Sequence, residues 1–270
     1  MTTINGTVAG IKISAELIST DADLRTLVDQ LEAVALISLD IETTGYEGQS
    51  DYGPSSGVIR LCQIAWHDDS EMKVVVIDAE KVDLSIIRPL LESEDIAKLI
   101  HYSPFECKWF KHHLEIKIVG AVDTCYLGQS INKTLRGRVA RALTDDLDDK
   151  DSLQRSLFKI ADSYSLPSGR EVSLVEVKKA YDSVEIPIKG WKLSERATLQ
   201  AMVKRYLGHD LDKDGQTSDW SGELTDEQLV YAAGDAVVTL QIWPDVVKVA
   251  EQLDVYANMI RRVGYDEAKS

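Results

Sequence analysis

Five segments in the first half of the chain have the pattern of strands, either short apolar runs or apolar residues that alternate with polar ones. They lie at about residues 34–41, 58–66, 73–78, 97–100 and 119–123. Short polar links join the first three, which predicts an antiparallel meander. Helical spacing then separates the later strands, so that helices and strands alternate. We therefore expect an α/β protein with a mixed five-stranded sheet that is flanked by helices.

Helices are predicted wherever apolar residues recur every three or four positions. These segments lie at about residues 21–32, 84–91, 104–113, 124–131, 195–207 and 224–243. Gly208 is a suitable C-cap for the fifth helix, and Thr225-x-x-Gln228 has the form of a capping box at the start of the sixth. Pro244 is expected to begin a further helix that reaches about residue 262, and residues 8–13 are expected to form an edge hairpin.

Residues 132–195 differ in character from the segments on either side. They begin with basic residues, turn acidic between Asp145 and Asp151, and continue with amphipathic helical spacing. We expect residues 1–270 to form a single domain in which 132–195 are a largely helical insertion.

The composition narrows the classes of function. A net charge of −15 argues against a protein that coats nucleic acid non-specifically, but it allows an enzyme that takes a strand end into a local site. Three widely spaced cysteines without zinc spacing are typical of a reducing compartment. The apolar runs are too short to span a bilayer, and the N-terminus lacks the pattern of a signal peptide. We therefore expect a cytoplasmic protein without membrane contact.

Two carboxylates, Asp40 and Glu42, end the first of the five strands. Because side chains alternate along a strand, both point to the same face and lie roughly 7 Å apart. A divalent metal with oxygen ligands would offset their repulsion. Two exposed acids at a strand end are the alternative interpretation, and the pair alone leaves both open.

A third acid, Asp235, lies in the middle of a predicted helix that is apolar on nearly every side. Aspartate is unfavourable at such a position and is seldom buried without a partner. Tyr231 lies one turn earlier on the same face. The alternative is a partly exposed Asp235 on a polar stripe with Tyr231 in the core, although Gly234, Ala236 and Val238 offer no such stripe.

Glu106 has two interpretations. Ser103-x-x-Glu106, with Pro104 at the first helical position, has the form of a capping box in which the carboxylate returns to the Ser103 amide. The start of a helix after a strand edge is also a suitable place for a carboxylate that faces a cleft. The residues by themselves favour the cap but leave the ligand open.

Taken in order, these segments resemble the DEDD superfamily of 3′–5′ exonucleases, in the subgroup with a catalytic tyrosine. That subgroup includes ribonuclease D, the Werner-syndrome exonuclease domain and the proofreading domain of family A DNA polymerases. Asp40-Ile41-Glu42-Thr43-Thr44-Gly45 is similar to the first exonuclease motif, and residues 101–110 are similar to the second. Tyr231-Ala232-Ala233-Gly234-Asp235-Ala236 is similar to the third. The resemblance covers roughly residues 34–129 and 196–243.

The resemblance implies a ribonuclease H-like fold and an active site with two Mg²⁺ or Mn²⁺ ions, for which four carboxylates are suitable ligands. It places Asp40 on both metals, and Glu42 and Asp235 on the metal that holds the attacking water. Glu106 would hold the second metal, and Tyr231 would orient the water. The partner would be a nucleic acid with a 3′ end, either a single strand or a frayed duplex end, that is degraded to 5′-mononucleotides.

Glu106 departs from the family pattern, which has an aspartate at this position. A second function therefore stays open, namely a catalytically impaired nucleic-acid-binding module in which Glu106 is only a helix cap. A calcium-stabilised structural domain would use the same acids but leaves Tyr231 unexplained. The choice between DNA and RNA and the oligomeric state stay open as well.

Side chains outside the three motifs are weaker candidates for contact with the strand. Trp66 and Trp220 could stack on bases. Several basic residues could guide the strand, although solvated helix faces explain any single one equally well. They are Lys133, Arg136, Arg138, Arg141, Lys178, Lys179, Lys189, Lys192 and Arg196.

Overall fold

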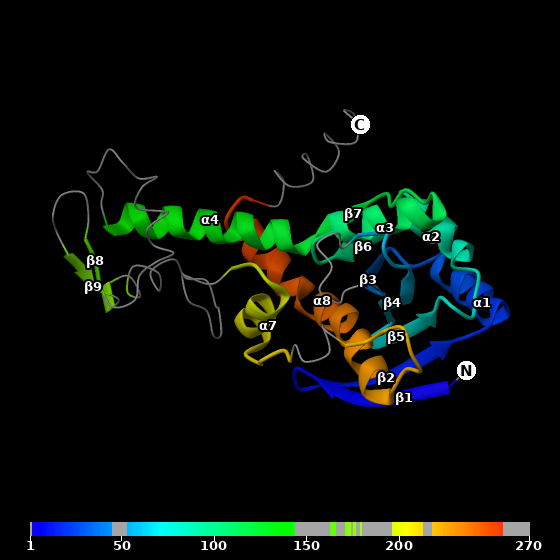
Figure 1. Ribbon diagram of the computed structural model, residues 1–270. Helices are drawn as coiled ribbons and strands as arrows, with labels where there is room; N and C mark the ends of the chain where they lie inside the picture. The colour runs from blue at the N-terminus through cyan, green and yellow to red at the C-terminus, as the bar shows by residue number, and fades with distance from the viewer. Residues whose placement is uncertain are drawn as a thin grey trace.

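A seven-stranded mixed sheet forms the centre of the molecule (Figure 1). The computed structural model describes residues 2–44, 53–143, 163–165, 171–173, 175–176, 179, 196–212 and 218–255. The sheet order is β1-β2-β5-β4-β3-β6-β7. Its strands are β1 (Thr2–Val8), β2 (Ile11–Ile18), β3 (Leu36–Thr43), β4 (Ile59–Asp68), β5 (Glu71–Asp78), β6 (Ala97–Ile100) and β7 (Ala121–Asp123). A separate hairpin consists of β8 (Ser163–Ser165) and β9 (Glu171–Ser173).

The predicted α/β class is confirmed, and β3, β4 and β5 form the predicted antiparallel meander. β6 then pairs in parallel with both β3 and β7. The expected number of five strands is wrong, because the N-terminal hairpin extends well beyond residues 8–13 and joins the sheet. Its second strand pairs in parallel with β5, from Ala15 opposite Val74 to Ile18 opposite Ile77. Most side chains of β1 are exposed or half-buried, so its sequence pattern resembles that of a surface segment.

The helices follow the predicted spacing, with changes at their ends. They are α1 (Asp21–Leu31), the 3₁₀ helix η1 (Leu84–Ile87), α2 (Arg88–Glu92), α3 (Pro104–Leu114), α4 (Thr124–Leu143), α7 (Leu199–Leu207) and α8 (Asp226–Gln252). The C-cap at Gly208 and the capping box at Thr225 both form as predicted. Among the described residues, no helix combines the length and the apolar character that a membrane span requires.

The predicted break at Pro244 is wrong, because α8 continues through this residue to Gln252. A proline removes one backbone hydrogen bond but need not end a helix that is held by packing on both sides of it. Ile242 before the proline and Val246 after it are both fully buried in the same apolar cluster. The expected reach to about residue 262 lies partly outside the described residues.

The predicted end of the fourth helix is also wrong, because α4 runs on to Leu143 within the expected insertion. Leu135 and Val139 lie one turn apart and are fully buried, so the apolar stripe of α4 continues past residue 131. Most of the segment 144–195 lies outside the described residues, and β8 and β9 in it are strands. That residues 132–195 form a largely helical insertion in a single domain therefore stays a prediction.

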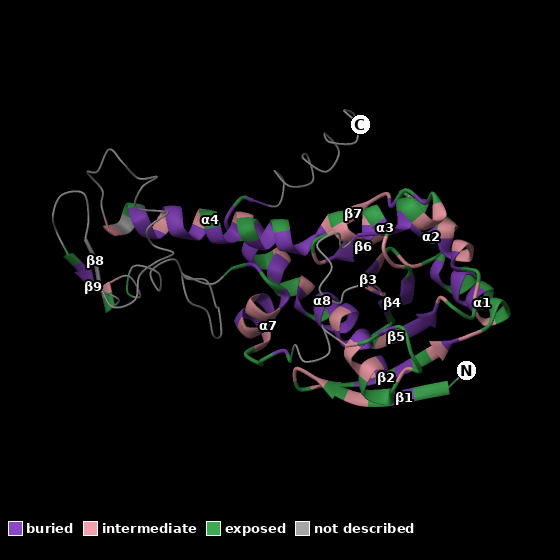
Figure 2. Ribbon diagram, in the orientation of Figure 1, coloured by how far each residue is buried: buried purple, intermediate pink, exposed green. Residues whose placement is uncertain are grey.

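Helices cover both faces of the sheet. α1, α2 and α3 pack on one face against Ile37, Leu39 and Ile41 of β3. α8 crosses the opposite face and contacts β1, β3 and β4, while its second half packs against α4 and α7 beyond the sheet (Figure 1). Figure 2 shows that buried residues concentrate in the central strands and along α8, whereas β1 is exposed along its outer side.

Lys98 of β6 places an ammonium group in the interior. Its side chain is buried, and Nζ donates a hydrogen bond of 2.5 Å to the carbonyl oxygen of Ser93. Burial lowers the pKa of Lys98 from 10.5 to about 8. At neutral pH the folded chain therefore carries the cost of a desolvated charge.

We expect Lys98→Met to raise the free energy of unfolding by about 1 kcal/mol at neutral pH, because methionine has a similar shape and no charge. The folded chain releases the Lys98 proton near pH 8 and the unfolded chain near pH 10.5, so the wild type gains stability between these values. Urea unfolding across this range measures the effect, and the advantage of the variant should shrink as the pH rises. An advantage that does not change with pH would contradict this account.

Candidate active site

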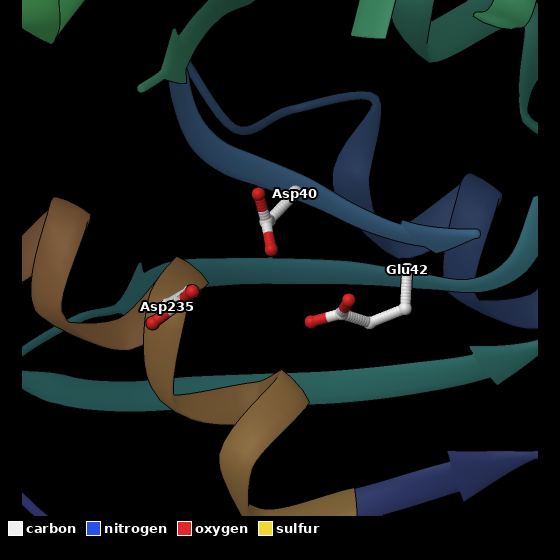
Figure 3. A group of neighbouring side chains, drawn as sticks. All are labelled: Asp40, Glu42 and Asp235. Carbon is white, nitrogen blue, oxygen red and sulfur yellow. The ribbon is translucent and has the colours of Figure 1, made fainter. Parts of the chain in front are cut away.

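Three carboxylates converge where the end of β3 lies beside α8. Asp40 and Glu42 project from β3, and Asp235 projects from α8 toward them (Figure 3). Each residue offers one carboxylate oxygen, and these oxygens all lie within 4.8 Å of one another. All three side chains are half-buried, so the cluster is sheltered but can be reached from solvent. The structure thus brings together the strand pair and the helical acid that the sequence singled out.

The alternation of β3 directs the first two carboxylates. Ile37, Leu39 and Ile41 enter the core beneath α1 to α3, so Asp40 and Glu42 face the other way, toward α8. An apolar residue on every second position therefore both anchors the strand and aims the acids.

The start of α8 and a close helix–strand contact place the third carboxylate. Thr225 Oγ1 accepts a 3.2 Å hydrogen bond from the Gln228 amide, and the Gln228 side chain accepts one of 3.0 Å from the Thr225 amide. This capping box fixes the residue at which α8 begins. A Cβ at Gly234 would lie 2.8 Å from Val8 of β1, so glycine at this position allows the close approach that carries Asp235 to the cluster.

Burial is the main cause of the raised pKa values in the cluster. It raises the pKa of Asp40 well above its ordinary value, and the charge of Asp235 raises it further. Burial likewise raises the pKa of Glu42, with added repulsion from Asp40, Asp235 and Glu106. Without a cation the carboxyl groups are therefore driven toward their protonated forms, and bound positive charge would reverse this.

Glu106 lies near the cluster, but it is not one of the three acids whose oxygens lie within 4.8 Å of one another. It occupies the first turn of α3, its side chain is 2% exposed, and its Oε2 atom is buried without a hydrogen-bond partner. Burial and then the charge of Asp40 raise its pKa. The capping-box interpretation is wrong, because the Ser103 amide donates to Asp123 Oδ2 at 2.7 Å instead. A buried carboxylate oxygen that lacks a donor fits a cation ligand better than a helix cap.

Tyr231 lies one turn before Asp235 on α8 and lines the same cleft. Burial first, and then the charges of Asp235 and Glu42, raise the pKa of its phenol above the ordinary value of 10. The hydroxyl therefore stays protonated at neutral pH and can donate a hydrogen bond. Trp220 packs beside it with the ring centroids 6.4 Å apart and is 3% exposed, so this ring supports Tyr231 rather than offering a free face to a base. Trp66, the other candidate for stacking, is also buried.

A cleft of about 480 Å³ surrounds these residues. The end of β3, the starts of α3, α4 and α7, and the first half of α8 contribute to its wall. The sequence predicted no role for several residues that line the cleft. They come from segments far apart in the sequence, and only the fold brings these segments together. They are Tyr102, Phe105, Cys125, Gln129, Thr198 and Gln200.

The basic residues proposed to guide a strand have different positions. Arg196 is exposed and lines the cleft. Arg136 is buried in α4, where burial lowers its pKa to about 10, so its proposed role as a surface guide is wrong. Lys178, Lys189 and Lys192 lie outside the described residues.

Comparison with known families agrees with this geometry. A family model described as 3'-5' exonuclease matches residues 15–165 and 175–251. The chain belongs to the 3′–5′ exonuclease family. It is therefore a hydrolytic exonuclease, and its mixed sheet with flanking helices is the ribonuclease H-like fold expected from the sequence.

One curated relative shares a short segment with this exonuclease. DNA polymerase I of Aquifex aeolicus (strain VF5) is 41% identical over 61 residues, which are 22% of this chain and 11% of the polymerase. The exonuclease thus matches only a small part of that protein's length.

Solved structures share the fold at low sequence identity. The Nibbler EXO domain of Aedes aegypti has a TM-score of 0.56 and 18% identity, over 91% of this chain and 93% of that one. Escherichia coli RNase D has a TM-score of 0.54 and 20% identity, over 93% of this chain and 51% of that one. Trypanosoma brucei RNase D, solved in complex with RNA U12, has a TM-score of 0.55 and 19% identity, with coverages of 90% and 70%.

The acidic cluster of the exonuclease suits a hard divalent cation. The group of potential ligands found among the described residues consists of carboxylates alone. Oxygen ligands are those that Mg²⁺ and Mn²⁺ prefer. The raised pKa values of Asp40 and Glu42 and the unpartnered Oε2 of Glu106 are the features that such a cation would relieve.

Proposed function

We propose that this exonuclease removes 5′-mononucleotides one at a time from the 3′ end of a nucleic acid, with Mg²⁺ or Mn²⁺ held by its carboxylates. The observation that carries the proposal is the approach of Asp40, Glu42 and Asp235 to within 4.8 Å of one another. Glu106 and Tyr231 line the same cleft. Two cations, when bound, would stabilise the negative charge on the attacking and leaving oxygens of an in-line displacement.

The resemblance to the DEDD exonucleases implies a role for each acid. Asp40 would ligate both cations, because it interacts with the other three acids. Glu42 and Asp235 would complete the site that holds the attacking water. Glu106 would complete the second site with the oxygen that lacks a donor.

Tyr231 would position the attacking water and would not remove a proton as a free base. Its raised pKa keeps the phenol protonated, so the hydroxyl can donate a hydrogen bond from the wall of the cleft. The packing of Trp220 against the ring limits its rotation.

The proposal is tested with the full chain and 5′-labelled single strands of RNA and DNA of matched sequence. We expect shortening from the 3′ end in Mg²⁺ or Mn²⁺, release of nucleoside 5′-monophosphates, and arrest of the reaction by EDTA. Binding without shortening in either metal would contradict the proposal and favour the nucleic-acid-binding module. The ratio of the rates on RNA and on DNA shows which of the two the enzyme prefers.

Variants of Glu106 test whether it is a ligand. We expect Glu106→Gln to lower kcat by about 100-fold, or about 3 kcal/mol, because it removes a charge that faces the cation. Glu106→Asp should keep the rate within about tenfold of wild type, since it retains the carboxylate.

The matching control is thermal stability, because a helix cap contributes to stability and a metal ligand contributes to the rate. Since Glu106 makes no cap bond to Ser103, neither substitution should loosen the start of α3. A Glu106→Gln variant with an unchanged rate would show that the ligand role is wrong.

We also infer a cytoplasmic location, as expected from the sequence. Its support is that Cys62, Cys107 and Cys125 are all free thiols, as is usual in a reducing compartment. Fractionation of cells that express the tagged chain would test it.

A further inference from the structure

Two tyrosine side chains lie exposed beside the cleft. Tyr102 is 51% exposed and Tyr126 is 40% exposed, and their rings meet edge to face with centroids 6.1 Å apart and an interplanar angle of 75°. Tyr102 belongs to the lining of the cleft, while Tyr126 lies just beyond it in the first turn of α4. In the described part of the chain, only Val58 and Val175 are comparably exposed large hydrophobic residues.

One buried carboxylate fixes the backbone at both rings. Asp123 Oδ2 accepts hydrogen bonds from the Ser103 amide at 2.7 Å and from Ser103 Oγ at 2.9 Å. Asp123 Oδ1 accepts one of 2.9 Å from the Tyr126 amide. The end of β7 thereby ties the turn that carries Tyr102 to the helix start that carries Tyr126.

The backbone of Tyr102 adopts an unfavourable conformation, and its ring lies outside the apolar core. Its φ is 73°, in the left-handed region that residues with a Cβ atom seldom occupy. Neither tyrosine belongs to any of the three apolar clusters of the described structure. Two exposed aromatic rings at the mouth of a cleft, on backbone that Asp123 holds in place, are better explained by a ligand than by stability.

We propose that the Tyr102–Tyr126 pair is a stacking site for an unpaired base of the strand whose 3′ end enters the cleft. This inference rests on the proposed function. In an edge-to-face pair at least one ring face stays free, and every base has a face that can stack on it. A base within a duplex is already covered on both sides, so the site selects single strands or frayed ends.

The charge of the protein makes such a site useful. The net charge of −15 opposes the approach of phosphates. Stacking provides affinity that does not depend on phosphate contacts and that is less sensitive to salt. The strand is therefore held by a base near the cleft while its terminal phosphodiester bond lies among the carboxylates.

Steady-state degradation of a short single strand tests the site. We expect Tyr126→Ala and Tyr102→Asn to raise KM about tenfold with kcat changed less than about twofold, as for the loss of one stacked base. Asparagine is chosen at position 102 because it tolerates a positive φ. Tyr126→Phe keeps the ring and should behave as the wild type, and Val175→Ala is the control for an exposed apolar side chain elsewhere.

Strands that lack the base at one position at a time locate the contact. In the wild type, removal of the stacked base should raise KM about tenfold, and in Tyr126→Ala the same removal should have no further effect. Unchanged KM in both variants, equal loss in Tyr126→Phe and Tyr126→Ala, or a fall in kcat alone would overturn the stacking site. If the wild type shortens no strand, the proposed function fails, and fluorescence anisotropy of strand binding with the same variants still decides the stacking site.

Discussion

Asp40→Asn should lower the rate of phosphodiester hydrolysis by at least about 1000-fold, or about 4 kcal/mol of transition-state stabilisation. The charge of Asp40 acts on Glu42 and Glu106, and the pKa of Asp40 is itself raised by burial and then by the charge of Asp235. A ligand in that central position would serve both of the proposed cations, so its loss should affect the attacking and the leaving oxygen together. The measurement is release of 5′-mononucleotides from a labelled strand in Mg²⁺ and in Mn²⁺.

Asp69→Asn is the matched control for this variant. Asp69 is exposed in the turn between β4 and β5, and its φ of 53° is one that asparagine also adopts readily. It therefore loses one negative charge without backbone strain and should keep the wild-type rate. An Asp40→Asn variant that retains more than about a tenth of the activity would contradict the two-cation arrangement.

A divalent cation should raise the free energy of unfolding, by about 2.7 kcal/mol at a concentration 100 times its Kd. The carboxyl groups of Asp40, Glu42 and Glu106 have pKa values above their ordinary values of 3.8 for Asp and 4.5 for Glu. Between the ordinary and the raised values, the folded chain binds protons that the unfolded chain has released. The cation-free protein therefore loses stability as the pH rises through this interval, and the loss is complete above the raised values.

Thermal unfolding in EDTA and in Mg²⁺, from acidic to slightly alkaline pH, measures this effect. We expect the difference in Tm between the two conditions to widen as the pH rises, because the repulsion that the cation offsets grows. Asp40→Asn should raise Tm in EDTA and reduce the shift on addition of Mg²⁺, while Asp69→Asn should change neither. A shift of the same size in Asp40→Asn would mean that the cation binds elsewhere.

The sequence predicts the parts of this structure that depend on local pattern. Alternation in β3 correctly aims Asp40 and Glu42 at one face, and the Thr225 capping box correctly sets the start of α8. The spacing of Tyr231 and Asp235 on one helical face follows from the same kind of argument. These features depend on residues close in sequence, so no knowledge of the tertiary packing is needed.

Features that depend on distant contacts could not be predicted in this way. Ser103 and Glu106 have the form of a capping box, but the Ser103 amide donates its hydrogen bond to Asp123 at the end of β7. Pro244 should end a helix by local rules, yet burial on both sides of it holds α8 together. The proposed stacking site at Tyr102 could not be predicted, because Tyr126 of α4 lies beside it only in the folded chain.

The N-terminal hairpin has a consequence for how this enzyme can diverge from its relatives. The family match begins at residue 15, inside β2, yet β1 lies against α8 where Gly234 meets Val8. A chain that began at residue 15 would keep all the proposed ligands and lose the strand that packs against α8 at Gly234. Substitutions in β1 could therefore alter the spacing of Asp235 from the strand pair, and with it the choice of metal, while every ligand stays the same.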